Sequence, residues 1–172
     1  LRSQSLKGVD FKSPVSVIKG LNEAFPMEQQ NNKYFTIWYG VYQKNDHQLI
    51  YSSAGHPHAI LFTGDNTDKI ELQTLSTAGL PVGVMEDFEF KESTVSLSKQ
   101  NKLYVFSDGV YEITKKDGVE MTLESFTKII KDDFSSLETL QSDKVLEKII
   151  SLKNEIGPFD DDFSIVELII NS

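Results

Sequence analysis

The chain has 172 residues, of which 39% are hydrophobic and 10% aromatic, so it can bury one core of its own. It contains no cysteine, which excludes disulfides, thiolate metal sites and cysteine nucleophiles. The net charge of −9 repels nucleic acid, and no apolar run is long enough to span a membrane, so we expect neither nucleic-acid binding nor membrane insertion.

The first half of the chain predicts one helix followed by a series of strands. Ser13 and Pro14 are a typical N-cap and first helical residue, and the apolar spacing from Val17 onward predicts a helix over residues 14–25. A turn over residues 44–47 separates two alternating runs and predicts a hairpin. The strands expected in this half cover residues 34–41, 48–53, 59–62, 70–75 and 88–97.

The second half predicts one more strand, two helices and a final strand. The apolar run 103–106 is a short strand, and the last strand covers residues 163–170. Thr122 and Ser142 are placed to cap the two helices between them, and Gly157-Pro158 ends that region. Because strands outnumber helices and adjoin through hairpins, the expected fold class is α+β with antiparallel sheet.

Two acidic groups stand at the ends of apolar strands. Asp108 directly follows the strand 103–106, and the run 160–162 directly precedes the strand 163–170. If the two strands are neighbours, Asp108 and either Asp161 or Asp162 converge, and converging carboxylates need a cation to offset their repulsion. Such an all-oxygen site suits Mg²⁺ or Mn²⁺. The alternative is that each aspartate is an ordinary turn residue.

Two loop segments contain glycine at positions that suggest tight turns. Gly55-His56 lies between two predicted strands, where His56 is either a ligand or acid, or a residue that hydrogen-bonds a loop carbonyl. The segment from Gly79 to Gly83 lacks the strand-to-helix context and the lysine of a phosphate-binding loop. We therefore interpret it as a structural turn.

Taken in order, these motifs resemble the SpoIIE/RsbU phosphatases, which belong to the metal-dependent type 2C protein phosphatase superfamily. Each motif is weak alone, whereas the ordered set is specific, and the resemblance extends from about residue 14 to residue 170. The motifs are Thr36 with Tyr39-Gly40, Ala54-Gly55-His56-Pro57, Gly79-Leu80-Pro81-Val82-Gly83, Ser107-Asp108-Gly109-Val110 with Glu112, and Asp161-Asp162-Phe163-Ser164.

This resemblance implies a β-sandwich of two mainly antiparallel sheets with flanking helices, and a site for two Mn²⁺ or Mg²⁺ ions. It implies that Asp108 and Asp161 bind metal, with Gly109 and Asp162 beside the site. The remaining motif residues are expected to shape the loops, and no ligand role is expected for them: Thr36, Gly55, His56, Gly79, Gly83 and Glu112.

One departure from the family pattern affects the expected activity. The family carries an earlier Asp-x-x-Gly-His-Gly motif whose aspartate bridges both metals, and nothing in the 172 residues matches it. We therefore expect residues 1–172 to be the C-terminal part of a single phosphatase domain that lacks its first strands. Alone, this part is expected to bind metal weakly, to have little activity, and to form a homodimer through an exposed sheet edge.

The function implied by the resemblance is bacterial signal transduction, of the kind that controls stress responses. The expected reaction is hydrolysis of phosphoserine or phosphothreonine on an anti-anti-sigma-type regulatory protein by metal-activated water. The expected location is the cytoplasm, either free or as the cytoplasmic part of a larger sensor. Two alternatives stay open: a non-catalytic, partner-binding phosphatase-like domain, and a Ca²⁺-binding module built on residues 160–162.

Overall fold

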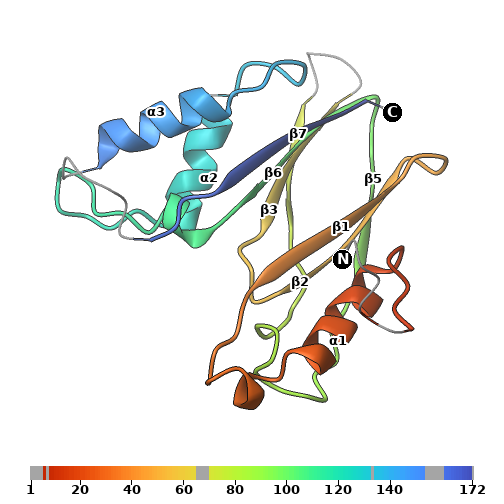
Figure 1. Cartoon of the computed structure of the whole chain (residues 1–172). Coiled ribbons are helices and arrows are strands. Elements are labelled where there is room, and N and C mark those ends of the chain that lie inside the picture. Colours follow the sequence, from red (N-terminus) through yellow and green to blue (C-terminus); the bar gives the residue numbers. More distant parts are fainter. Residues whose placement is uncertain (1–5, 7, 65–69, 133, 154–160, 172) are drawn as a thin grey trace. The chain divides into compact units, whose positions relative to one another are not determined.

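A computed structural model of the chain describes residues 6, 8–64, 70–132, 134–153 and 161–171 (Figure 1). Three α-helices and seven strands lie in this described part, with two short 3-10 turns. In chain order they are α1 (Pro14–Ala24), η1 (Met27–Gln29), β1 (Ile37–Gln43), β2 (Gln48–Ala54), β3 (Ala59–Gly64), β4 (Glu71–Leu75), β5 (Ser93–Ser96), β6 (Gln100–Phe106), η2 (Asp108–Val110), α2 (Leu123–Asp132), α3 (Ser142–Leu152) and β7 (Ile165–Asn171).

The chain divides into two compact units, each assembled from two stretches of sequence. The first unit contains residues 1–58 and 75–97, and the second contains residues 59–74 and 98–172. Each unit holds one antiparallel sheet, with strand order β1-β2-β5 in the first and β4-β3-β6-β7 in the second. The expected α+β class with two antiparallel sheets is therefore confirmed, and the prediction of one domain over residues 1–172 stays a prediction.

In the first unit, α1 packs on the sheet through a small apolar core. Ser13 caps the helix by accepting a hydrogen bond from the Ser16 amide at 3.3 Å, as its sequence position predicts. The β1–β2 hairpin pairs Gln43 with Gln48 and Ile37 with Ala54, which confirms the hairpin. The buried residues of this core are Ile18, Ala54, Val82 and Phe90.

In the second unit, α2 and α3 cover one face of the four-stranded sheet. Alternate residues of β3 and β6 face these helices, because successive side chains of a strand point to opposite faces. Strands β6 and β7 pair antiparallel from Gln100–Asn171 to Phe106–Ile165, so the two strands that carry the acidic groups are direct neighbours. The buried core shared by sheet and helices includes Ile60, Phe62, Tyr104, Phe106, Phe126, Ile130, Val145 and Ile149.

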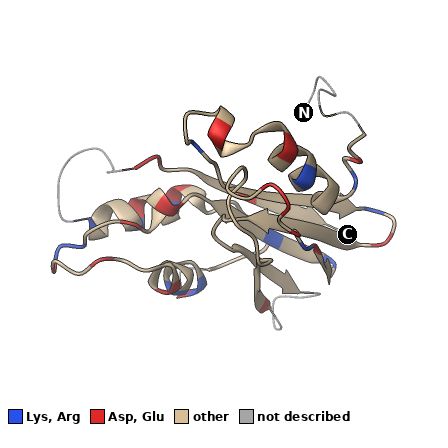
Figure 2. Ribbon diagram, turned by 90° about the horizontal axis from the view of Figure 1, so that it is seen from below, with Lys and Arg blue, Asp and Glu red and all other residues tan. Residues whose placement is uncertain are grey.

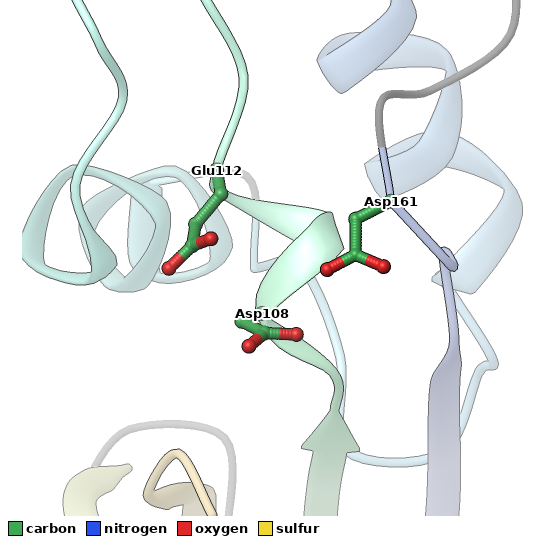
Figure 3. A group of neighbouring side chains, drawn as sticks. All are labelled: Asp108, Glu112 and Asp161. Carbon is green, nitrogen blue, oxygen red and sulfur yellow. The ribbon is translucent and has the colours of Figure 1, made fainter.

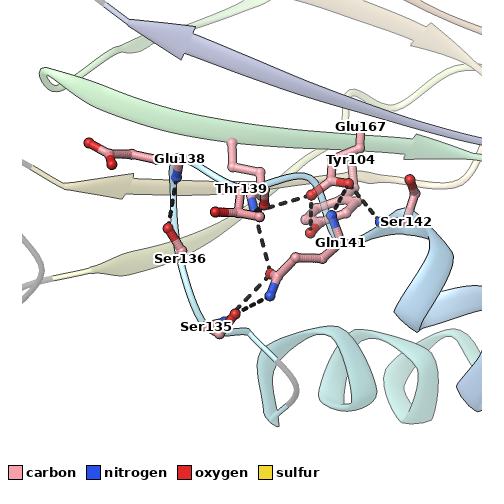
Figure 4. A network of polar contacts seen from close by, with 9 residues as sticks. Tyr104, Ser135, Ser136, Glu138, Thr139, Gln141, Ser142 and Glu167 are labelled. Carbon is pink, nitrogen blue, oxygen red and sulfur yellow. Dashed lines mark hydrogen bonds and ion pairs between the residues drawn. The ribbon is translucent and has the colours of Figure 1, made fainter.

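One predicted strand is much too long, and one predicted helix cap is wrong. The strand expected over residues 88–97 is shorter, Ser93–Ser96, because the Lys91 carbonyl accepts a hydrogen bond from the Ser52 hydroxyl at 2.7 Å instead of joining a ladder. Ser142 does not cap α3. The Glu167 carboxylate on β7 accepts hydrogen bonds from the Gln141 and Ser142 amides at 2.6 and 2.7 Å and replaces a local cap (Figure 4).

The other predicted elements are present, but several strands have different ends: the strands predicted at 34–41, 103–106 and 163–170 are Ile37–Gln43, Gln100–Phe106 and Ile165–Asn171. Thr122 caps α2 through a hydrogen bond from the Ser125 amide at 3.2 Å. The predicted end of the α3 region at Gly157-Pro158 lies outside the described residues. Within the described residues, every helix is too short or too polar to cross a membrane.

Candidate metal centre

Three carboxylates meet at one end of the β6–β7 pair. Asp108, Glu112 and Asp161 each place a ligand oxygen within 4.8 Å of the others, and all three side chains are exposed (Figure 3). Asp108 opens η2, Glu112 follows that turn, and Asp161 lies on the segment that leads into β7. The two aspartates singled out in the sequence therefore do lie side by side, and the structure adds Glu112 to them.

The convergence follows from how the strands end. Phe106 pairs with Ile165, so the residues just after β6 and just before β7 lie at the same edge of the sheet. Ser107 ties the two segments together: its amide donates to the Ser164 carbonyl at 2.9 Å, and its hydroxyl donates to the Asp162 carbonyl at 2.8 Å. The Ser164 amide donates back to the same hydroxyl at 2.9 Å. Ser107 is thus a clamp that sequence reasoning did not identify.

Gly109 lets the two segments approach closely. It is buried, and a Cβ added to it would lie 2.6 Å from the Asp162 carbonyl oxygen, a distance that real Cβ contacts do not reach. Any other residue would push the segment that carries Asp161 away from η2. The glycine next to Asp108 therefore supports the spacing between the two aspartates.

Glu112 joins the cluster because of the turn that follows β6. The amides of Tyr111 and Glu112 both donate to the Asp108 carbonyl at 2.9 Å, which curls the chain back over Asp108. Residues four apart on such a curl lie on the same side. This geometry brings the Glu112 carboxylate into the cluster, whereas the sequence resemblance implied no ligand role for Glu112.

The local charge of the cluster is strongly negative. One oxygen of Asp108 accepts from the Gly109 amide at 3.1 Å and one of Asp161 accepts from the Asp162 amide at 2.7 Å. Among the described lysines and histidines, none forms an ion pair with the three acids. Burial raises the pKa of Tyr111, and the neighbouring charges of Glu112 and Asp108 raise it further.

This donor set fits a hard divalent cation. All three donors are carboxylate oxygens, the ligands that Mg²⁺ and Mn²⁺ favour. Oxygens on opposite sides of a bound Mg²⁺ lie about 4 Å apart, so a separation within 4.8 Å needs only small side-chain adjustments. Three protein ligands leave coordination positions for water or a phosphate oxygen.

Five of the sequence motif residues belong to the first unit, whereas the cluster belongs to the second. They are Thr36, Gly55, His56, Gly79 and Gly83. The two glycine motifs contact each other there, because the Gly55 amide donates to the Gly79 carbonyl at 3.0 Å and Gly55 packs against Pro81. The His56 ring nitrogen Nδ1 lies 3.0 Å from the Pro57 carbonyl oxygen, a contact within its own loop.

The remaining predicted site residue, Asp162, contributes its backbone. Its carbonyl accepts from Ser107, and among the described residues its side chain is not part of a group of three potential metal ligands. Asp160, the first residue of the acidic run, lies outside the described residues.

A protein-family model and a curated relative both match most of this chain. The family model described as stage II sporulation protein E (SpoIIE) matches residues 1–170. "Phosphoserine phosphatase RsbU" of Bacillus subtilis is 26% identical over 156 residues, which cover 90% of this chain and 44% of that protein. The chain thus spans less than half the length of this curated relative.

Solved structures share the fold at low sequence identity. The SiaA-PP2C domain of Pseudomonas aeruginosa matches with a TM-score of 0.78 and 16% identity, covering 98% of this chain and 65% of that one. The phosphatase domain of SpoIIE from Bacillus subtilis, in a structure described as Mn presoaked, matches with a TM-score of 0.62 and 19% identity over 96% and 68% of the two chains. These matches support a type 2C phosphatase-like fold.

Proposed function

This chain belongs to the SpoIIE family, and we propose that it acts as part of a metal-dependent phosphatase for phosphoserine or phosphothreonine in a regulatory protein. The observation that carries the proposal is the convergence of Asp108, Glu112 and Asp161 at the end of two neighbouring strands. The RsbU relative is named a phosphoserine phosphatase, which agrees with this reaction class.

The three carboxylates would hold Mn²⁺ or Mg²⁺, and two ions are expected in the complete domain. Such ions, when bound, supply an activated water for attack on phosphorus and offset the charge of the phosphoryl oxygens. Cations held by the carboxylates would supply positive charge at one point of a chain whose net charge is −9, which would make an anionic substrate acceptable there. Because the cluster is exposed, it can meet a phosphate on the surface of another protein.

The substrate and the location are part of the same proposal. We infer a phosphorylated anti-anti-sigma-type protein as substrate from the family resemblance. We also propose a cytoplasmic location for this chain, as the same resemblance implies.

The test is phosphate release from a phosphoserine peptide in the presence of Mn²⁺. The 172-residue chain is expected to be weak, because it has no Asp-x-x-Gly-His-Gly motif. In any longer form of the protein that carries this motif, Asp108→Ala should reduce turnover by about 100-fold or more. The exposed Asp132 on α2 provides the control Asp132→Ala, which should leave turnover unchanged. Equal turnover by Asp108→Ala and the unaltered protein would contradict the proposal.

Because the 172 residues contain no Asp-x-x-Gly-His-Gly motif, a non-catalytic function is an alternative that the same test addresses. A phosphatase-like domain that only binds partners predicts a longer form without turnover, whether or not Asp108 is intact. A Ca²⁺-binding module predicts tight Ca²⁺ binding by calorimetry without phosphate release. The same protein preparations therefore separate all three functions.

We also propose that two copies of the chain form a homodimer through the edge of β7. No described strand pairs with the outer edge of β7, and Val166 and Leu168 are 52% and 46% exposed there. Unpaired apolar edge strands favour pairing with another strand. Light scattering should therefore give the mass of a dimer, and Val166→Lys should shift it toward the monomer. A monomer at all concentrations would exclude this arrangement.

A further inference from the structure

A second exposed feature lies in the first unit, at the end of α1. Four large apolar side chains gather there and form an apolar patch, which we define as Phe25, Phe35, Val84 and Met85. Their exposed fractions are 41%, 38%, 38% and 53%. The Phe25 and Phe35 rings meet edge to face with centroids 5.9 Å apart, and Phe35 accepts a hydrogen bond from the Val82 amide at 2.8 Å.

The loop that carries half of this patch is held rigidly by Asn22. The Asn22 side chain, 3% exposed, donates to the carbonyls of Met85 and Glu86 at 2.9 and 3.0 Å and accepts from the Gly83 amide at 2.8 Å. Three satisfied hydrogen bonds from one buried amide fix the loop backbone. The apolar side chains of Val84 and Met85 are therefore presented to solvent by an ordered loop, and binding would cost little ordering entropy.

An acidic rim borders the apolar patch. A cavity of about 350 Å³ is lined by four acids, Glu23, Glu86, Asp87 and Glu89, and by the single basic residue Lys19. None of these four acids forms an ion pair with a described lysine. Glu86 and Asp87 directly follow Met85, and Glu23 is two residues before Phe25, so the rim and the patch lie on the same two segments of the chain.

We propose that the apolar patch and the acidic rim together form a docking surface for a protein segment that presents apolar and basic side chains. Exposed apolar groups rimmed by charge mark interaction sites more often than scattered apolar residues do. The negative charge of the rim favours a positively charged segment, because opposite charges promote association and like charges oppose it.

Other occupants fit less well. A second copy of this chain docked through the same face would be related by two-fold symmetry, so four acids would meet four acids. Nucleic acids and anionic lipid surfaces are repelled for the same reason. A cationic apolar segment alone satisfies both parts of the surface.

Acidic residues are spread along the whole chain (Figure 2), so a test must separate this face from general charge attraction. The probe is a fluorescein-labelled amphipathic peptide in which leucine and lysine recur at helical spacing, titrated by anisotropy without divalent ions. Leaving out the ions makes the result independent of the metal centre and of the phosphatase proposal. A peptide with glutamate in place of lysine is expected not to bind.

Two variants probe the two parts of the surface. The triple variant Glu86→Gln, Asp87→Asn, Glu89→Gln and the single variant Met85→Gln should each weaken binding by about tenfold or more. The matched triple control removes exposed acids of the second unit, Glu124→Gln, Asp132→Asn, Glu147→Gln, and the matched apolar control is Ile150→Gln. Both controls should change the affinity by less than about twofold.

Three outcomes would overturn the proposal. The first is equal weakening by the two triple variants, which would indicate attraction by net charge only. The second is unchanged binding by Met85→Gln, which would leave the apolar patch without a role. The third is a dimer in sedimentation velocity that Met85→Gln dissociates, which would make a second copy the occupant.

Discussion

Two groups of charged side chains lie along the β6–β7 pair, one exposed at its end and one buried in its middle. At the end of the pair, Asp108, Glu112 and Asp161 are exposed and have no described cation beside them. In the middle of the pair, the side chains of Lys102 and Glu167 are 0% and 1% exposed and lie 3.1 Å apart. The same two strands thus hold one unneutralised and one fully neutralised site.

The buried site satisfies each of its charged groups (Figure 4). One Glu167 oxygen accepts from the Tyr104 hydroxyl at 2.7 Å, and the other accepts from the Gln141 and Ser142 amides. Lys102 donates to the Thr139 carbonyl at 2.5 Å as well as contacting Glu167. Burial raises the pKa of the Tyr104 hydroxyl, and its hydrogen bond to Glu167 raises it further, so it stays a donor.

The two sites differ in whether neighbouring protein groups balance the charge. A buried carboxylate must be paired and hydrogen-bonded, because desolvation otherwise costs several kcal/mol. The exposed cluster escapes that requirement but concentrates three like charges, which a divalent ion would offset. Removing a negative charge should therefore have opposite consequences for folding at the two sites.

The largest effect is expected from Glu167→Gln. The change leaves the Lys102 ammonium buried without its counter-charge and weakens the cap of α3, so the free energy of unfolding should fall by about 3–5 kcal/mol. Urea unfolding at neutral pH measures this loss. The exposed Glu147 on α3 provides the control Glu147→Gln, which should stay within about 0.5 kcal/mol. A loss below about 1 kcal/mol at Glu167 would show that the pair is not an essential part of the core.

Next in size is Gly109→Ala. The added Cβ would meet the Asp162 carbonyl at 2.6 Å, so the two segments must separate, at a cost of about 1–3 kcal/mol. The affinity for Mn²⁺, measured by electron paramagnetic resonance, should fall with it because Asp108 and Asp161 move apart. Gly118→Ala is the comparison: it places alanine at φ +79° with no atom nearby, so it strains the backbone but should not alter Mn²⁺ affinity.

A smaller, pH-dependent effect should come from the buried carboxylate. Burial alone would raise the pKa of Glu167, but hydrogen bonds from Tyr104, Gln141 and Lys102 outweigh it and hold the pKa below the ordinary value of a glutamate. The folded state therefore binds this proton less readily than the unfolded state, so the stabilisation is present above about pH 4.5 and is lost as pH falls through the folded-state pKa. Urea midpoints of the unaltered protein should fall more steeply below pH 4.5 than those of Glu167→Gln. Parallel curves would refute the assignment.

The smallest change in stability is expected from Asp108→Asn. Without metal, removing one of three clustered charges should leave the free energy of unfolding unchanged or raise it by up to about 0.5 kcal/mol. Mn²⁺ affinity should nevertheless fall by about tenfold or more. A variant that is strongly destabilised without metal would contradict the contrast between the two sites.

Much of the local structure was predictable, because its causes lie within a few residues. Ser13 and Pro14 start α1, the turn at residues 44–47 closes the first hairpin, and apolar runs mark β6 and β7. Asp108 and the acidic run 160–162 stood out because each lies beside such a run, and the family resemblance selected Asp161 within that run. Glu112 did not stand out as a potential ligand, because its approach depends on the curl of η2 over the Asp108 carbonyl.

Short-range chemistry, namely caps, turns and alternating apolar residues, was enough to assign the α+β class and to place Asp108 and the acidic run 160–162 at strand ends, and the family resemblance then selected Asp161. Pairing between distant segments decided the rest. Ser107 clamps a segment 55 residues away, and Glu167 caps a helix that starts 25 residues earlier. Such partners cannot be identified from sequence spacing. Buried polar groups need hydrogen-bond partners, and the packing of the folded chain decides which groups are close enough to serve.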